Sequence, residues 1–143
     1  QSDAKKVGIK INLKNVDYNV LDGIGVRGEY DLLISNILTE QAGDPEVFVN
    51  QYWKTNVDGS NPQNGSGYSN PEYDALSDQL ASEFDPAKRR DIIIKMEKIV
   101  QDDAAALIFG YPQTNMVSNK SVQNANIYPC DYYWVTKDIT PAK

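Results

Sequence analysis

Histidine is absent from this sequence of 143 residues, and cysteine occurs only once. Without histidine the chain has no serine–histidine triad, no histidine metal site and no side chain whose ordinary pKa lies near neutral pH. The single thiol, Cys130, can neither close a disulfide within the chain nor join a second thiolate around a metal. We therefore expect no metal and no other cofactor, and we expect Cys130 to be a partly buried, inert thiol.

Basic residues are outnumbered, and long apolar runs are missing. The chain has 14 Lys and Arg against 20 Asp and Glu, which gives a net charge of −6. The basic residues form no patch that would neutralise phosphates, so nucleic acid is not expected as a partner. No apolar stretch approaches the roughly 20 residues that cross a bilayer. The hydrophobic fraction of 41% and the length predict one globular domain, residues 1–143.

Two amphipathic helices are predicted within residues 67–104. Asn70 followed by Pro71 starts the first helix, and Asp85 followed by Pro86 ends it and starts the second. Apolar residues recur at helical spacing in both segments, so each helix is expected to bury one face. The residues with this spacing are Tyr73, Leu76, Leu80 and Phe84, then Ile92, Ile93, Met96, Ile99, Val100 and Ala104.

The opposite face of the second helix is charged, and we expect it to be solvated. Its residues carry both signs, and Asp91 precedes Lys95 in the favourable i, i+4 order. The members of this predicted charged face are Lys88, Arg89, Asp91, Lys95, Glu97, Lys98 and Asp102.

Strands are predicted on both sides of a short helix near residues 20–24. Residues 7–13 alternate between apolar and polar, which is typical of a strand with one buried face. Residues 30–38 are almost continuously apolar, as in a strand covered on both faces, so the order indicates a right-handed parallel crossover. Residues 105–117 add a strand that Pro112 confines to an edge or a bend. The pattern predicts an α/β fold with a mixed sheet flanked by helices.

Two kinds of short motif match the consensus sequence of a functional site: a glycine motif and two glycosylation sequences. Residues 23–28 read Gly-Ile-Gly-Val-Arg-Gly, but six residues separate them from Val16 and a strand is predicted to follow. The dinucleotide-binding motif should directly follow a strand and open a helix, so we expect no nucleotide here and interpret the glycines as a flexible turn. Asn64, in a predicted surface loop over residues 54–66, and Asn119 begin glycosylation sequences, which is weak evidence alone.

A polar loop over residues 39–45 follows the second predicted strand and leads into a predicted helix over residues 46–53. In open α/β sheets, ligands bind where such loops leave the carboxyl ends of the strands. An alternative stays open for this loop. It is a plain connection in which Asp44 caps the following helix and Pro45 occupies its first turn.

Several motifs in the chain occur together in one known family. Residues 67–74 read Gly-Tyr-Ser-Asn-Pro-Glu-Tyr-Asp, residues 85–86 Asp-Pro and residues 102–104 Asp-Asp-Ala. Residues 28–32 are similar to that family's Gly-Asp-Phe-Asp-Leu entry to a strand, and residues 43–45 match its Gly-Asp-Pro turn. In this order, the motifs resemble the C-terminal lobe of the oligopeptide-, dipeptide- and nickel-binding solute-binding proteins of ABC importers.

The resemblance implies one lobe of a type II periplasmic-binding-protein-like fold, in a two-lobed receptor that closes around its ligand. It implies an extracytoplasmic protein, in the periplasm or as a bacterial cell-surface lipoprotein. The implied partners are a peptide or small solute such as a metal chelate, the ABC permease subunits, and the missing N-terminal lobe of the same protein. Members of the family are much longer, so we expect an excised C-terminal lobe of a monomeric protein.

The resemblance also locates a ligand site. In peptide-binding members, an aspartate in the loop before the Gly-Asp-Pro turn binds the α-ammonium of the peptide. Gln41 occupies that position here, and its side chain does not supply the charge-assisted bond of a carboxylate. Either Glu40 takes this role or the ligand lacks a free ammonium group. We predict that Thr39, Glu40 and Gln41 face the cleft and contact the ligand.

Two other functions remain as alternatives. The same lobe could serve as a sensor or regulatory module fused to an effector, which flanking sequence would reveal. A carboxylate-based hydrolase such as a glycosidase would need an acid and a base, for example Asp102 with Asp103 or Glu40 with Asp44. Adjacent residues on a helix point apart, and the second pair lies in a short turn, so we expect no enzyme.

Overall fold

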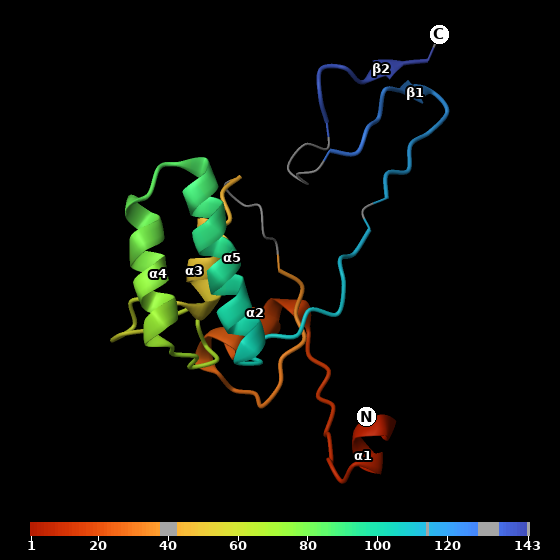
Figure 1. Ribbon diagram of the computed structural model, residues 1–143. Coiled ribbons are helices and arrows are strands. Elements are labelled where there is room, and N and C mark those ends of the chain that lie inside the picture. The colour runs from red at the N-terminus through yellow and green to blue at the C-terminus, as the bar shows by residue number, and fades with distance from the viewer. Residues whose placement is uncertain (38–42, 114, 129–134, 143) are drawn as a thin grey trace. The chain divides into compact units, whose positions relative to one another are not determined.

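The computed structural model describes residues 1–37, 43–113, 115–128 and 135–142. Residues 1–105 form one compact unit and residues 106–143 another. The first unit contains helices α1 (Ser2–Lys6), α2 (Tyr18–Arg27), α3 (Glu46–Trp53), α4 (Pro71–Ser82) and α5 (Pro86–Asp102) (Figure 1). The second contains an antiparallel pair of strands, β1 (Val122–Gln123) and β2 (Thr140–Pro141), in which Val122 lies opposite Pro141.

Helices α4 and α5 form an antiparallel hairpin joined by residues 83–85 (Figure 1). The Asn70 side chain accepts hydrogen bonds from two amides of the first turn of α4, at 2.9 and 3.2 Å. The Asp85 side chain does the same for α5, at 2.9 and 3.0 Å. Each cap satisfies two of the amides that a helix start leaves unpaired. Both predicted helices and both predicted start signals are confirmed.

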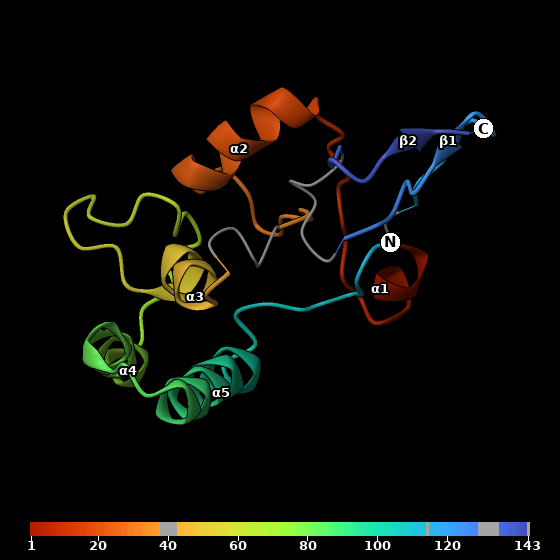
Figure 2. The ribbon, with the colours of Figure 1, turned by 90° about the horizontal axis from the view of Figure 1, so that it is seen from above.

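Helix α3 packs against both helices of the hairpin, and Figure 2 views the three nearly end-on. The apolar faces meet in one core, in which burial of each large side chain contributes roughly 1.5–3 kcal/mol. Its buried apolar members are Val49, Tyr73, Leu80, Ile92, Ile93, Met96 and Val100. Phe84 was predicted in this stripe, but it is 86% exposed. Because α4 ends at Ser82, residue 84 lies in the turn and leaves the helical phase.

The strands predicted over residues 7–13, 30–38 and 105–117 do not form among the described residues. Alternation and apolar runs favour extended chain, but a strand also needs a neighbour with which to exchange backbone hydrogen bonds. In the described parts of these segments many apolar side chains stay in solvent, with Leu32 81% and Phe109 80% exposed, while Ile11 and Leu33 are partly buried. The helices and small sheet are compatible with an α/β lobe, whereas the larger mixed sheet is not seen among these residues.

The glycine motif lies within α2 and at its end, so the prediction of a flexible turn is wrong. Asp17 caps the helix at the Asn19 amide, and Gly28 ends it with a φ of +65°. The close approach of another loop explains Gly28 of the motif and Gly65 of that loop, whereas a Cβ on Gly25 would meet only Leu33 Cδ2 at 3.4 Å. A Cβ on Gly65 would overlap the carbonyl oxygen of Gly25, and a Cβ on Gly28 would overlap the carbonyl oxygen of Gly65. The motif therefore allows two backbones to pack together.

The loop between α3 and α4 is held in part by one buried asparagine side chain. Asn64 is only 3% exposed, and its Nδ2 donates to the carbonyl oxygens of Lys54 at 3.0 Å and Tyr68 at 2.8 Å. A buried amide with both bonds made is not accessible to a glycosylating enzyme. Asn64 therefore has a structural role in this loop, where its side chain pairs with two backbone carbonyl groups.

Tyr68 and Asp103 join the start of α4 to the end of α5. The Tyr68 hydroxyl donates to Asp103 Oδ2 at 2.6 Å, and Asn70 Nδ2 donates to the same oxygen at 2.8 Å. These two hydrogen bonds lower the pKa of Asp103 below its ordinary value. Burial, followed by the hydrogen bond to Asp103, raises the pKa of Tyr68 to about 12.

The raised pKa of Tyr68 predicts a loss of stability in alkali. Its ordinary value is 10.0, so the stabilisation from the neutral hydroxyl is complete below pH 10 and disappears as the pH rises toward 12. We expect the urea midpoint of the full-length protein to fall over this range, and to fall less steeply in Tyr68→Phe. Tyr18→Phe, at a residue that is 68% exposed, is the control. An equally steep fall in Tyr68→Phe would contradict the prediction.

Candidate functional site

The predicted ligand-contacting residues Thr39, Glu40 and Gln41 lie outside the described residues, as does Cys130. The described chain resumes at Gly43 and enters α3 at Glu46. Gly43 has a φ of +70°, and no atom lies within 4 Å of the place where its Cβ would be. Glycine is therefore favoured there by the backbone angle rather than by lack of space.

Asp44 binds the first amide of α3, as the alternative interpretation of this loop predicted, but the helix begins at Glu46, so Pro45 lies at the N-cap position and not in the first turn. Its Oδ1 accepts a hydrogen bond from the Glu46 amide at 2.9 Å. Its Oδ2 accepts from Arg89 Nη2 at 2.8 Å, and Glu46 Oε2 accepts from the same nitrogen at 2.8 Å. The side chains of Asp44 and Glu46 are 44% and 28% exposed. One cation thus holds both acidic side chains at the start of α3.

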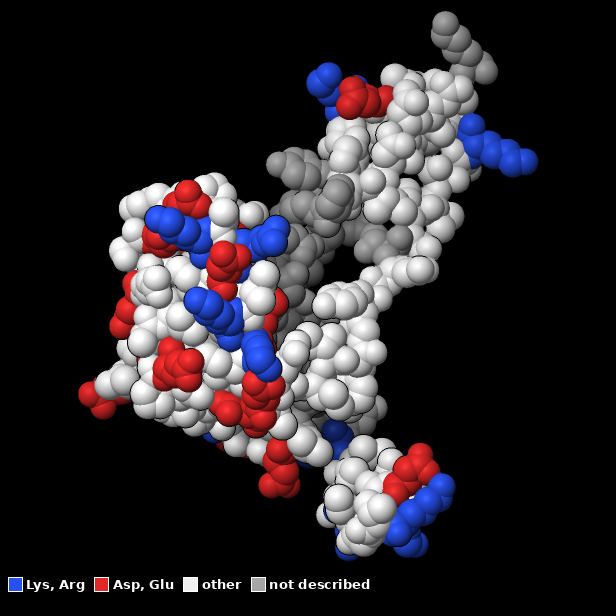
Figure 3. All heavy atoms as spheres, in the orientation of Figure 1, with Lys and Arg blue, Asp and Glu red and all other residues white. Residues whose placement is uncertain are grey.

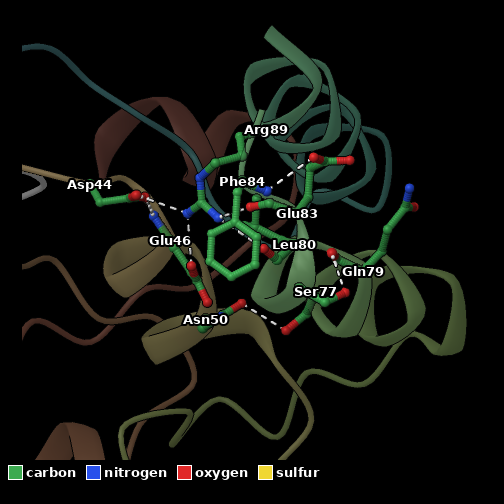
Figure 4. Close-up of polar contacts among 10 residues, drawn as sticks. Asp44, Glu46, Asn50, Ser77, Gln79, Leu80, Glu83, Phe84 and Arg89 are labelled. Carbon is green, nitrogen blue, oxygen red and sulfur yellow. Dashed lines mark hydrogen bonds and ion pairs between the residues drawn. The ribbon is translucent and has the colours of Figure 1, made fainter. Parts of the chain in front are cut away.

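The guanidinium of Arg89 connects three parts of the first unit (Figure 4). In addition to the two carboxylates, it reaches the end of α4. Its Nη1 donates to the carbonyl oxygens of Leu80 at 2.9 Å and Glu83 at 2.7 Å. The hydrogen bond to Glu46 is the main cause that raises the pKa of Arg89, and burial opposes it. The side chain therefore stays charged while its donors are used within the protein.

The charge pattern placed Arg89 on the solvated face of the second helix, and this prediction is wrong. The side chain is only 18% exposed. Arg89 lies in the first turn and a half of α5, next to the last turn of α4, where backbone carbonyls lack helical partners. A cation within reach of such carbonyls is the sequence signal that could have identified it.

The rest of the predicted charged face is exposed, and positive and negative side chains are interspersed over it (Figure 3). Lys98 pairs with Asp102 at 2.8 Å across one helical turn, and both side chains are more than half exposed. An exposed pair of this kind contributes little to stability. The prediction of a solvated face is confirmed for Lys88, Asp91, Lys95, Glu97, Lys98 and Asp102.

Two further contacts fix α3 on α4. Ser77, which is fully buried, donates from its Oγ to Asn50 Oδ1 at 2.8 Å (Figure 4). The Tyr73 hydroxyl donates to the carbonyl oxygen of Val49 at 2.6 Å. Together with Arg89, these bonds tie the start and the middle of α3 to the hairpin, so the segment that leads into α3 ends on a helix held in place.

Three of the four carboxylates considered for hydrolysis lie in the described chain, and each of them makes another contact. Asp102 binds Lys98, Asp103 accepts from Tyr68, and Asp44 is occupied by Arg89 and the Glu46 amide. In the part of the chain that the structure describes, no group of three or more acidic, cysteine or histidine residues is placed to hold a metal ion. In that same part, every helix is too short or too polar to span a bilayer.

The sequence is similar to two curated binding proteins. It is 32% identical over 124 residues to the probable D,D-dipeptide-binding periplasmic protein DdpA of Escherichia coli (strain K12), which covers 86% of this chain and 23% of that protein. It is 30% identical over 135 residues to the nickel-binding protein NikA of Staphylococcus aureus (strain NCTC 8325 / PS 47), covering 94% and 26%. No family model and no solved structure matches the chain.

The chain is a relative of dipeptide- and nickel-binding proteins. This confirms the resemblance to the solute-binding family that the sequence motifs indicated. The chain spans about a quarter of the length of these two solute-binding relatives, at 23% and 26%. Both relatives are named for what they bind and neither for catalysis, which supports the expectation that this chain is not an enzyme.

Proposed function

We propose that the chain is the C-terminal lobe of an extracytoplasmic solute-binding protein that captures an oligopeptide or a related small solute for an ABC importer. The ligand would lie in a cleft against the N-terminal lobe of the same monomeric protein, and the permease subunits would receive it. The observation that carries this proposal is the sequence similarity to two binding proteins. The alignments cover 86% and 94% of this chain, at 32% and 30% identity.

A metal chelate is the second candidate ligand, and the similarity to a nickel-binding protein favours it. The sequence contains no histidine, and the described residues present no cluster of metal ligands. A nickel ion bound here would therefore bring most of its own ligands, as it does in a chelate. The protein would then recognise the organic part of the complex rather than the bare ion.

We propose that Thr39, Glu40 and Gln41 contact the ligand. Gln41 precedes Asp44 by three residues. The Asp44 side chain is held at the start of α3 by the Glu46 amide and by Arg89. Glu40 would supply the carboxylate for a peptide ammonium, because the amide of Gln41 makes a weaker, uncharged bond. Thr39 would add a hydroxyl that donates or accepts.

The proposed loop predicts a specific pattern of affinities in the full-length protein. The probes are D-alanyl-D-alanine, its N-acetyl derivative and a Ni²⁺–citrate chelate, measured by titration calorimetry. If Glu40 binds the ammonium, Glu40→Ala weakens binding of the free dipeptide by about tenfold or more. Gln41→Asp should strengthen it, because a second carboxylate joins the site.

Two comparisons test this prediction. Glu97→Ala removes an exposed acidic residue of α5 and should leave the affinity unchanged. The N-acetyl dipeptide has no ammonium, so Glu40→Ala should not weaken its binding further. Unchanged binding of the free dipeptide in both Glu40→Ala and Gln41→Ala would remove this loop from the site.

A further inference from the structure

We infer that Arg89 is a positioning residue for ligand binding, which acts through Asp44 and Glu46 on the loop that precedes them. This inference rests on the proposed function, in which residues 39–41 contact the ligand. It adds a residue that touches no ligand itself. Arg89 is 45 positions away from Asp44 in the sequence, yet their side chains are 2.8 Å apart.

The guanidinium holds two structures in one fixed relation. Its Nη1 is bound to the carbonyl oxygens of Leu80 and Glu83 at the turn of the hairpin. Its Nη2 is bound to the carboxylates of Asp44 and Glu46 at the start of α3. Because the guanidinium is planar and rigid, fixing one nitrogen fixes the direction of the other. The loop end therefore cannot shift against the hairpin without breaking charge-assisted bonds.

Loss of this cation would act on the loop first. The carboxylates of Asp44 and Glu46 both lie 2.8 Å from the same nitrogen, so without Arg89 they would repel each other. Asp44 is the more exposed of the two and can turn toward solvent. Its other oxygen accepts from the Glu46 amide, so its departure would also release the first turn of α3.

The Arg89→Lys variant tests whether Arg89 positions the start of α3 or only stabilises the folded protein. Lysine keeps the positive charge, but an ammonium on a flexible stem cannot reach four acceptors in the directions that the guanidinium serves. The matched control is Arg27→Lys. Arg27 also pairs with a carboxylate, Glu29, through two nitrogens at 2.7 and 3.0 Å, but its side chain is 55% exposed and this pair spans only two positions of the chain.

The test uses full-length wild type, Arg89→Lys and Arg27→Lys. Hydrogen exchange of peptides that cover residues 43–53 reports the start of α3, and calorimetry with D-alanyl-D-alanine and a Ni²⁺–citrate chelate reports binding. For Arg89→Lys we expect exchange at residues 43–47 to accelerate about tenfold and the affinity for the bound probe to fall about tenfold. Arg27→Lys should match the wild type in both measurements.

A second variant acts on the loop and leaves the α4 carbonyls alone. Asp44→Asn keeps an oxygen for the Glu46 amide but removes one charge facing Arg89, so we expect the same two changes at about threefold. If either variant lowers the melting temperature but leaves exchange at residues 43–47 and affinity at wild-type values, Arg89 only stabilises the hairpin and the inference is wrong. If the wild type binds neither probe, the proposed function fails and this inference fails with it; if the wild type binds a probe and both variants bind it equally well, only the inference fails.

Discussion

Replacing Gly65 with alanine is expected to lower the free energy of unfolding by about 3 kcal/mol or more. The added Cβ would overlap the carbonyl oxygen of Gly25 and lie 3.1 Å from the carbonyl carbon of Val26. Both atoms belong to the backbone of the last turn of α2, and the Gly25 carbonyl also accepts from the Gly28 amide at 3.2 Å, so neither can move aside as a side chain would. Urea unfolding of the full-length protein measures the loss, and hydrogen exchange should accelerate most in α2.

Two other glycines provide matched controls for the same chemical change. At Gly110 no atom lies within 4 Å of the place that a Cβ would occupy, so Gly110→Ala should be close to neutral. At Gly23 the new methyl group meets only the end of the Arg27 side chain, at 2.9 Å, which can move. If Gly65→Ala is as stable as Gly110→Ala, α2 does not pack against residue 65.

The helical hairpin could be predicted because its signals are local. Asn70 and Asp85 each precede a proline, and each side chain reaches amides within three positions of itself. A cap of this kind needs no partner from elsewhere in the sequence. The same holds for Asp44, whose capping of α3 was one of two interpretations of the loop. A helix start whose capping contact lies within one turn of the chain can therefore be predicted from the sequence alone.

The strands could not be predicted from local signals. Residues 7–13 have the alternation of a strand, but a strand requires a second segment at the right distance and register, which a pattern in one segment does not specify. Val7 and Leu13 are both 74% exposed, so their apolar face has no cover in the described chain. The two relatives are about four times as long as this chain.

In the candidate site too, contacts between residues that are distant in the sequence could not be predicted. Residues 39–41 were predicted from a family motif, and their role stays a proposal. Arg89 was assigned to solvent because it belongs to a run of charges of both signs that includes Lys88 and Asp91. Its true partners are 9, 6, 45 and 43 positions away, and only the folded hairpin brings them together. Gly65 carries no signal in the sequence for the same reason, since its constraint comes from α2.

Replacing Tyr73 with alanine is expected to lower the free energy of unfolding by about 4 kcal/mol. The ring is fully buried at the centre of the core that α3 shares with the hairpin, and it packs edge-on to Tyr68 at a centroid distance of 6.1 Å. Its removal leaves a cavity and also breaks the 2.6 Å bond to the carbonyl oxygen of Val49. Urea unfolding of the full-length protein measures the loss.

Tyr73→Phe separates the ring from the hydroxyl, because it keeps the volume and removes only the bond to Val49. That bond should account for about 1 kcal/mol, since folding exchanges a hydrogen bond with water for one within the protein. Tyr111→Ala, at a residue that is 85% exposed, should change the stability by less than about 0.5 kcal/mol. If Tyr73→Phe cost as much as Tyr73→Ala, the hydroxyl bond rather than the packed ring would hold α3 on the hairpin.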